Sequence, residues 1–152
     1  MPEPVICNSS CLIALEGIRR LDILEKLYGK VVIPEAVKEE FGVELPPWIQ
    51  VEKVKNKEAL SILLLELEKG EAEALVLASE KEGSTLVLDD KKARRIAAEL
   101  GLKFTGTLGI LIKAKKEGIL SEVRPVLEEI EKRGFRISEA LKEKVLKIAG
   151  EE

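Results

Sequence analysis

Short apolar runs and helical patterns alternate along most of this chain, and this alternation constrains its fold more than any other feature. The clearest helical pattern covers residues 57–67, where Leu60, Leu63, Leu64 and Leu67 recur at i, i+3, i+4 and i+7. Strands that alternate with helices predict a mainly parallel sheet with helices on both faces. The apolar runs bounded by polar turns predict short strands at residues 5–7, 31–33, 50–54, 85–88 and 103–104.

Turn and capping residues mark the ends of several of these elements. Pro34 suits the first turn of a helix after residues 31–33, and Gly101 suits the end of the helix before it. Ser9 and Ser10 are N-cap candidates after the first strand, and Ser138 is one for the last helix. Helical patterns at 108–116, 121–132 and 138–148 predict that the last third packs across the sheet as a group of helices.

The length and composition predict one globular domain over residues 1–152. Hydrophobic residues make up 45% and charged residues 35% of the chain, which excludes a disordered protein. No apolar run approaches the about 18 residues of a membrane span, and no secretion signal is recognisable. We therefore expect a cytoplasmic protein without a membrane partner.

The absence of histidine narrows the chemistry that the chain can perform. Cys7 and Cys11 are its only cysteines, so neither an ordinary zinc site nor a Cys/His nucleophile can be assembled, and we expect buried thiols. Acid and base chemistry is left to carboxylates, lysines or a metal-bound water. The net charge of −3 argues against a protein that coats nucleic acid but allows a small RNA substrate that is bound transiently.

Polar residues follow two of the predicted strands. Asn8, Ser9 and Ser10 follow the first strand, whereas Asp89 and Asp90 follow the apolar run at 85–88. Ligands of open parallel sheets bind outside the carboxyl ends of the strands, near the point where the strand order reverses. We therefore expect these two polar groups to border one crevice.

Two further acids lie on helices that can border the same crevice. Glu40 lies in the segment PEAVKEEF, and Glu73 lies in the apolar segment GEAEALVLA, where an unpaired buried carboxylate would be costly. Mg²⁺ and Mn²⁺ prefer oxygen ligands, so several carboxylates in one cleft predict a site for a hard cation. Such an ion lowers the pKa of a water molecule and offsets charge on a phosphate.

Five segments, together with their order and spacing, resemble the motifs of a prokaryotic subgroup of the PIN-domain family. They are VICNSSCLIAL, VIPEAVKEEF, GEAEALVLA, LVLDDKKARRIA and GTLGIL. The resemblance covers about Val5 to Gly150. It implies a three-layer α/β/α fold with a central, mainly parallel sheet of four to five strands and a helical C-terminal third. It also implies a ribonuclease that depends on Mg²⁺ or Mn²⁺, of the kind found as the toxin of toxin–antitoxin pairs, with an antitoxin as a possible protein partner.

Carried over residue by residue, the resemblance implies that Asn8, Glu40, Glu73 and Asp90 bind the metal and catalyse, with Asp89 beside them. Asn8 departs from the general family pattern, where an aspartate is expected; asparagine offers a carbonyl oxygen but no negative charge. We expect substrate contacts from Ser10, Lys91, Arg94 and Thr107. The apolar face of residues 60–67 is expected in the core, while Ile62 and Leu65 widen it and leave room for a homodimer contact.

Structural roles compete with each of these assignments. Asp89 or Asp90 could cap a helix that begins at Lys91, and Asn8 could hold the turn after the first strand. Glu71 suits a helix start, where its charge favours the macrodipole; it lies about 200° around the helix from Glu73, so both cannot face one ion.

Three further assignments have an alternative. Glu39 carries the same charge as Glu40 and is an equally good candidate for the metal ligand. The basic residues from Lys91 to Arg95 could be a solvated helix face, and the segment from Thr105 to Thr107 could cap a helix or complete the wall of the crevice.

Two other classes of protein compete with a nuclease as interpretations of this sequence. A PIN-like module that has lost catalysis and binds RNA or protein is favoured by Asn8. A phosphoacceptor receiver domain is disfavoured, because its acidic pair should follow the first strand, whereas this pair follows the run at 85–88.

Overall fold

The computed structural model describes residues 3–152 and contains one parallel sheet with the strand order β3-β2-β1-β4-β5. The order reverses at β1, because β2 and β3 extend the sheet on one side of it and β4 and β5 on the other. The switch point therefore lies between β1 and β4. The strands are β1 (Val5–Cys7), β2 (Val31–Pro34), β3 (Ile49–Glu52), β4 (Thr85–Val87) and β5 (Lys103–Thr105).

The sheet is buried on both faces because successive side chains of a strand point to opposite sides. Val5 and Cys7 belong to one core cluster and Ile6, between them, belongs to the other. The same alternation separates Val87 from Leu86. Apolar runs in this sequence therefore fill two cores at once, as in other parallel sheets.

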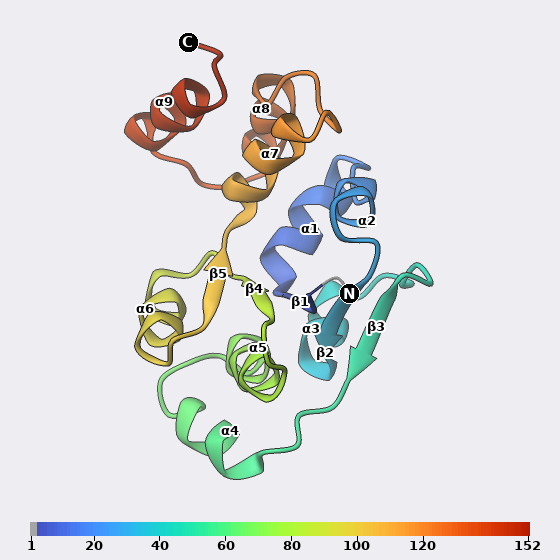
Figure 1. Ribbon diagram of the computed structural model, residues 1–152, viewed down its shortest axis with the longest axis vertical. Helices are drawn as coiled ribbons and strands as arrows, with labels where there is room; N and C mark the ends of the chain where they lie inside the picture. The colour runs from blue at the N-terminus through green and yellow to red at the C-terminus, as the bar shows by residue number, and fades with distance from the viewer. Residues whose placement is uncertain (1–2) are drawn as a thin grey trace.

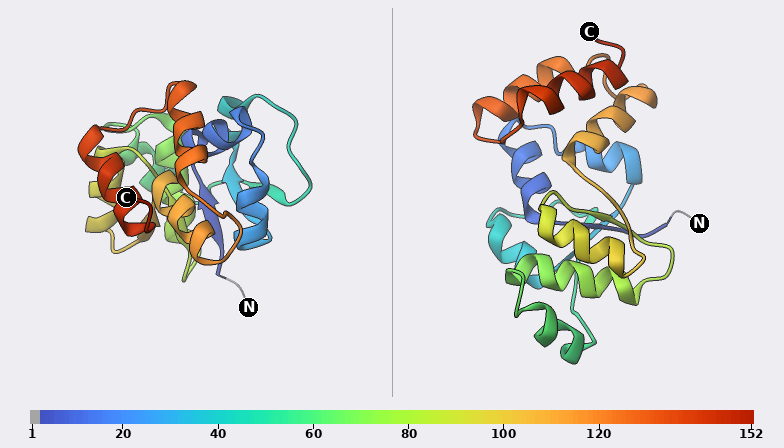
Figure 2. Two further views of the ribbon diagram at one scale, coloured as in Figure 1. Left: turned by 90° about the horizontal axis from the view of Figure 1, so that it is seen from above. Right: turned by 90° about the vertical axis from the view of Figure 1, so that its left-hand side faces the viewer.

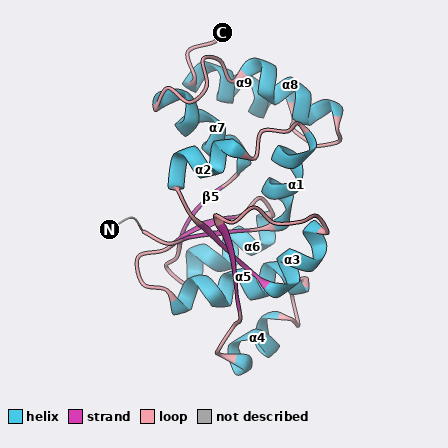
Figure 3. Ribbon diagram, turned by 90° about the vertical axis from the view of Figure 1, so that its right-hand side faces the viewer, coloured by secondary structure: helices cyan, strands magenta, loops and turns pink. Residues whose placement is uncertain are grey.

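Helices cover both faces and form the three-layer α/β/α arrangement that was predicted (Figure 1). One layer contains α1 (Ser9–Gly17), α2 (Asp22–Tyr28) and α7 (Thr107–Lys116); the other contains α5 (Lys69–Glu80) and α6 (Lys91–Glu99). Figure 3 shows the sheet edge-on between these layers. The helix α3 (Glu35–Phe41) contacts both α1 and α5.

The C-terminal helices pack on the outer side of the layer that contains α1, α2 and α7. They are α8 (Arg124–Lys132) and α9 (Glu139–Ile148). α8 contacts α1 and α9 contacts α7, and both lie beyond these helices when the molecule is seen from the side (Figure 2). The prediction of helices was confirmed, but α8 and α9 stack on other helices and do not pack across the sheet.

The leucine-rich helix α4 (Lys57–Leu63) lies outside α5 and ends earlier than the pattern predicted. Leu67 is buried, but Leu64 is 42% exposed and none of the helix's own residues is buried. The expectation of a core helix was therefore correct only in part: Leu67 belongs to a core cluster and Leu60 and Leu63 pack against it, but Leu64 does not. Ile62 and Leu65 are 65% and 84% exposed, so the widened apolar face is open to solvent.

Local signals predicted most element ends. Gly101 follows α6 with a φ of 74°, and the Ser138 hydroxyl accepts a hydrogen bond from Leu141 N–H at the start of α9. Pro34 is the N-cap of α3 and not part of its first turn. The thiols of Cys7 and Cys11 are buried, as predicted. Among residues 3–152 no helix is both long and apolar enough to cross a membrane.

Candidate functional site at the carboxyl edge of the sheet

Asn8 lies at the switch point and holds the turn from β1 into α1. Its backbone N–H donates to the Val87 carbonyl oxygen at 3.1 Å, and its side-chain Oδ1 accepts from the Cys11 N–H at 3.3 Å. Asn8 is 3% exposed and is the N-cap of α1. The prediction that Ser9 or Ser10 caps this helix was wrong, because the Asn8 side chain occupies that position first.

The two adjacent aspartates after β4 have different partners. Asp90 is the N-cap of α6, and its Oδ2 accepts from the Ala93 N–H at 2.9 Å. Asp89 reaches the start of α7, where its Oδ1 accepts from the Thr107 N–H at 2.8 Å and its Oδ2 from the Thr107 hydroxyl at 2.6 Å. The helix cap predicted for one of the pair therefore belongs to Asp90, and Asp89 joins the loops after β4 and β5.

Arg94 braces the same two loops. Its Nε donates to the Leu88 carbonyl oxygen at 2.7 Å, and its guanidinium carbon lies 5.3 Å from the centre of the Phe104 ring. A Cβ on Gly106 would lie 2.6 Å from Arg94 Nη2 and 2.8 Å from Asp89 Oδ1. Only glycine leaves room here for both side chains.

Glu73 ties α5 to the beginning of α3. Its Oε1 accepts from the Ala36 N–H at 3.1 Å, in the first turn of α3, where the N-cap Pro34 supplies no side-chain acceptor. Glu73 is 8% exposed. This contact satisfies a backbone donor at a helix start and places a negative charge where the macrodipole favours it. The carboxylate in the apolar segment is thereby paired.

Glu40 is exposed and lies against the first turn of α5. A Cβ on Gly70 would collide with Glu40 Oε1 and would lie 2.9 Å from its Cδ. The present position of the Glu40 side chain against α5 therefore depends on glycine at position 70. The Glu40 side chain makes no hydrogen bond or ion pair with another of residues 3–152, and its carboxylate remains open to solvent.

Glu71 lies in the first turn of α5 and joins this acidic group. Burial, followed by the negative charges of Asp90, Glu68 and Glu40, raises the pKa of Glu71 from its ordinary 4.5 to about 7. Sequence reasoning preferred a helix-start role for Glu71, and its position agrees with that. It missed the unbalanced negative charge around the residue, because the neighbours come from α3 and from the loop after β4. The sequence signal for this charge was the presence of two acids, Glu71 and Glu73, in the segment GEAEA.

The predicted substrate contacts lie in different environments. Ser10 and Lys91 are exposed, whereas Thr107 is fully buried and its hydroxyl donates to Asp89. Arg94 is half-buried, and its guanidinium group donates to the Leu88 carbonyl oxygen. Lys92 and Arg95 are exposed on α6.

The donor chemistry at this edge fits a hard divalent cation. Glu73 and Asp90 each use one carboxylate oxygen for a backbone N–H, and the second oxygen accepts no hydrogen bond from the described part of the chain. Glu40 and Glu71 add carboxylates that form no ion pair with the described residues. Within residues 3–152, however, no three acidic or cysteine side chains stand close enough together to ligate one ion. Ligation therefore requires rotation of the exposed acids.

The comparison with known protein families agrees with this architecture. A family model described as DUF3368, PIN domain, matches residues 4–151, which is nearly the whole chain. No curated protein matches the sequence. Because the match spans both helical layers, the sheet and the acidic edge, the chain belongs to the PIN-domain family.

Proposed function

We propose that this protein is an endoribonuclease of the PIN type that uses Mg²⁺ or Mn²⁺. The supporting observation is the set of carboxylates on α3, on α5 and after β4, where burial, followed by the charges of Asp90, Glu68 and Glu40, raises the pKa of Glu71. Like charges held together in this way favour a bound cation. PIN domains have a nuclease-type fold, so the location of this charge at the switch point supports the same function.

Each residue of the proposed site has a distinct part. Glu40, Glu73 and Asp90 would hold the cation. Glu71 lies about 200° around α5 from Glu73, so it would add negative charge that attracts the cation without being a ligand beside Glu73. Asn8 positions a water molecule or the substrate from the turn after β1. A divalent cation bound here would lower the pKa of a water molecule and offset charge on the scissile phosphate.

Asp89, Thr107 and Arg94 are positioning residues in this proposal. Asp89 and Thr107 join the loops after β4 and β5, and Arg94 holds the carbonyl group of Leu88. Ser10 and Lys91, which are exposed, would contact the RNA. The protein would act in the cytoplasm as the toxin of a toxin–antitoxin pair, with an antitoxin protein that blocks the site.

Cleavage of RNA tests the enzyme directly. Purified protein is mixed with structured and unstructured RNAs in Mn²⁺, in parallel with Asp90→Asn and with Glu99→Gln as a matched control on the exposed side of α6. Asparagine is a good N-cap, so the first variant should fold while losing a metal ligand. We expect cleavage by the native protein and Glu99→Gln only. Lack of cleavage by all three proteins would reject the enzyme.

A second candidate is a PIN-like module that binds RNA or protein without catalysis. Asn8 favours it, because its Oδ1 is already engaged by the Cys11 N–H and carries no negative charge. Calorimetric titration with Mn²⁺ separates the candidates. Binding that is lost in Asp90→Asn supports the enzyme, whereas absence of binding at millimolar Mn²⁺ in a folded sample supports the module.

A further inference from the structure

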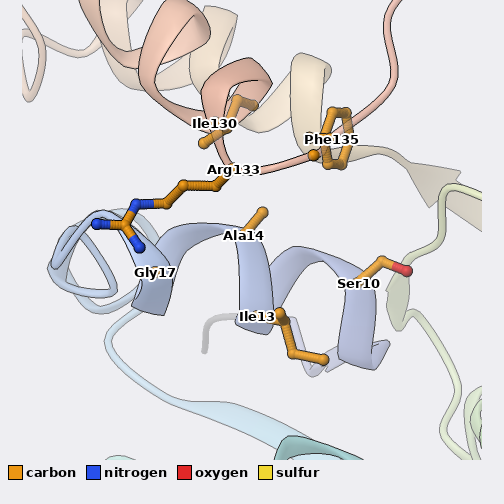
Figure 4. Close-up of a pocket in the computed structure, with 8 residues that line it drawn as sticks. Ser10, Ile13, Ala14, Gly17, Ile130, Arg133 and Phe135 are labelled. Atoms are coloured by element: carbon orange, nitrogen blue, oxygen red, sulfur yellow. The ribbon is translucent and has the colours of Figure 1, made fainter.

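A groove runs along α1 from the candidate site towards the end of α8. We call it the α1–α8 groove; its volume is about 410 Å³, and the residues used below are Ser10, Ile13, Gly17, Arg133 and Phe135. Such a volume falls within the range of small-ligand pockets, about 300–1,000 Å³. Figure 4 shows Ser10 and Gly17 at opposite ends of α1, with Arg133 and Phe135 on the facing wall.

The groove begins beside the acidic edge of the sheet. Ser10 is exposed in the first turn of α1, two residues after Asn8, whose backbone is hydrogen-bonded to β4. From Ser10 to Gly17 the helix rises by about 10 Å. A flexible chain that leaves the candidate site along α1 therefore enters this groove.

Arg133 supplies a positive charge at the far end of the groove. It is exposed, and none of the ion pairs formed among residues 3–152 includes it. Its side chain lies across α1 towards Gly17, where an added Cβ would lie 3.3 Å from Arg133 Cδ (Figure 4). The absence of a side chain at Gly17 lets the arginine lie flat on the helix.

Phe135 supplies a flat apolar surface in the same wall. The turn that carries it is held by hydrogen bonds from Arg133 N–H and Phe135 N–H to the Ile130 carbonyl oxygen, at 3.2 and 3.0 Å. Gly134, with a φ of 102°, allows this turn. Phe135 is half-buried, and Ile13 across the groove is 49% exposed. The aromatic ring and the guanidinium group are thus presented together on a fixed backbone.

We propose that the α1–α8 groove binds the single-stranded RNA that extends from the candidate site, with a phosphate on Arg133 and a base against Phe135. Single-stranded nucleic acids are bound in this way, by cationic groups along the backbone and aromatic side chains that stack on bases. A wholly apolar protein segment would leave the Arg133 charge without a partner. The inference rests on the proposed function, because it assigns the surface along which the RNA substrate of the same site would extend.

Binding without cleavage tests the groove separately from the enzyme. The affinity of the full chain for a short fluorescein-labelled single-stranded RNA of mixed sequence is measured by fluorescence anisotropy in EDTA over a KCl series. The variants are Arg133→Gln, Arg133→Lys and Phe135→Leu. Arg136→Gln is the matched control, since Arg136 is also exposed but does not line the groove. Thermal melting checks that each variant is folded.

We expect Arg133→Gln to reduce the slope of log Kobs against log[KCl] by about 0.7, the contribution of one phosphate contact in a single strand. Arg133→Lys should keep the slope, and Phe135→Leu should weaken binding by about tenfold at an unchanged slope. The proposal is overturned if Arg133→Gln and Arg136→Gln behave alike, or if the native protein does not bind the RNA.

Cleavage in Mn²⁺, measured in parallel, separates the two failures. Equal rates of RNA cleavage by the native protein, Arg133→Gln and Arg136→Gln would reject the role of the groove and support the enzyme. RNA binding that depends on Arg133, without cleavage by the native protein, would reject the enzyme and keep the groove as an RNA-binding surface.

Discussion

Both carboxylate oxygens of Asp89 accept hydrogen bonds from Thr107, one from its backbone N–H at 2.8 Å and one from its hydroxyl at 2.6 Å. The contact joins the loop after β4 to the first residue of α7, whose N-cap Gly106 has no side chain to offer. Asp89 thus performs for α7 the capping that Asp90 performs for α6. Within residues 3–152, Asp90 keeps one oxygen that accepts no hydrogen bond, whereas both oxygens of Asp89 are engaged.

Thr107→Val should destabilise the protein by about 1–3 kcal/mol, because it removes the hydroxyl donor and leaves an Asp89 oxygen without its partner. Urea unfolding followed by circular dichroism measures this. Thr85→Val is the control, since Thr85 is half-buried in β4 and valine suits a strand; its effect should stay within about 0.5 kcal/mol. Equal effects of the two variants would contradict a special role for the Asp89–Thr107 contact.

Gly70→Ala should weaken Mn²⁺ binding without destabilising the fold. The new Cβ would collide with Glu40 Oε1 and displace the exposed Glu40 side chain, while alanine in place of glycine favours a helix by up to about 1 kcal/mol. Calorimetric titration with Mn²⁺ measures the first effect and urea unfolding the second. Glu40→Gln is the comparison: if it loses Mn²⁺ affinity and Gly70→Ala does not, the placement of Glu40 against Gly70 is unimportant for the ion.

Glu151→Gln should reduce the loss in the free energy of unfolding that the protein undergoes as the pH falls. Burial opposes ionisation of this carboxyl, but hydrogen bonds from the Val123 and Arg124 N–H groups and from Lys115 outweigh it and hold the pKa of Glu151 below its ordinary 4.5. A depressed folded pKa adds stability above the unfolded value of about 4.5, and this stability is lost as the pH falls through the folded pKa.

The Glu151→Gln variant should therefore unfold more easily than the native protein at pH 7, and the difference should shrink at acid pH below about 4.5. Urea unfolding between pH 3 and pH 7 measures it. Glu152→Gln is the matched control, as Glu152 is exposed and next in the chain. A difference between native protein and Glu151→Gln that does not change with pH would show that the charge of Glu151 contributes nothing.

Leu65→Glu should convert a homodimer to a monomer. Leu65 and Ile62 are exposed, and Ile62 lines a nearly apolar hollow of about 220 Å³ bordered by α4, α5 and Leu100, so a two-fold interface over this surface would bury exposed apolar side chains and a recess together. Sedimentation velocity measures the mass. Leu141→Glu, at a partly exposed leucine of α9, should leave it unchanged. A native protein that is monomeric at high concentration would reject the homodimer.

The local pattern of the sequence predicted much of this fold. Short apolar runs bounded by polar turns placed the strands of the sheet within a few residues, and helical patterns placed the helices of the C-terminal third equally well, because both reflect which side chains face the core. The order of the acidic motifs indicated the family, which the family model confirmed. The exposure of α4 was not predictable, because an apolar face is compatible with a core as well as with a surface partner.

The chemistry of each acid at the edge was decided by tertiary contacts. Glu73 is paired with Ala36, 37 residues away, and Asp89 with Thr107, 18 residues away. The pKa of Glu71 is raised first by burial and then by the charges of Asp90, Glu68 and Glu40, of which Asp90 and Glu40 come from other elements. The sequence determined which side chains carry oxygen and where the strands end. Only folding decided which oxygens accept a backbone N–H and which remain for a cation, since hydrogen bonding and burial depend on neighbours that are remote along the chain.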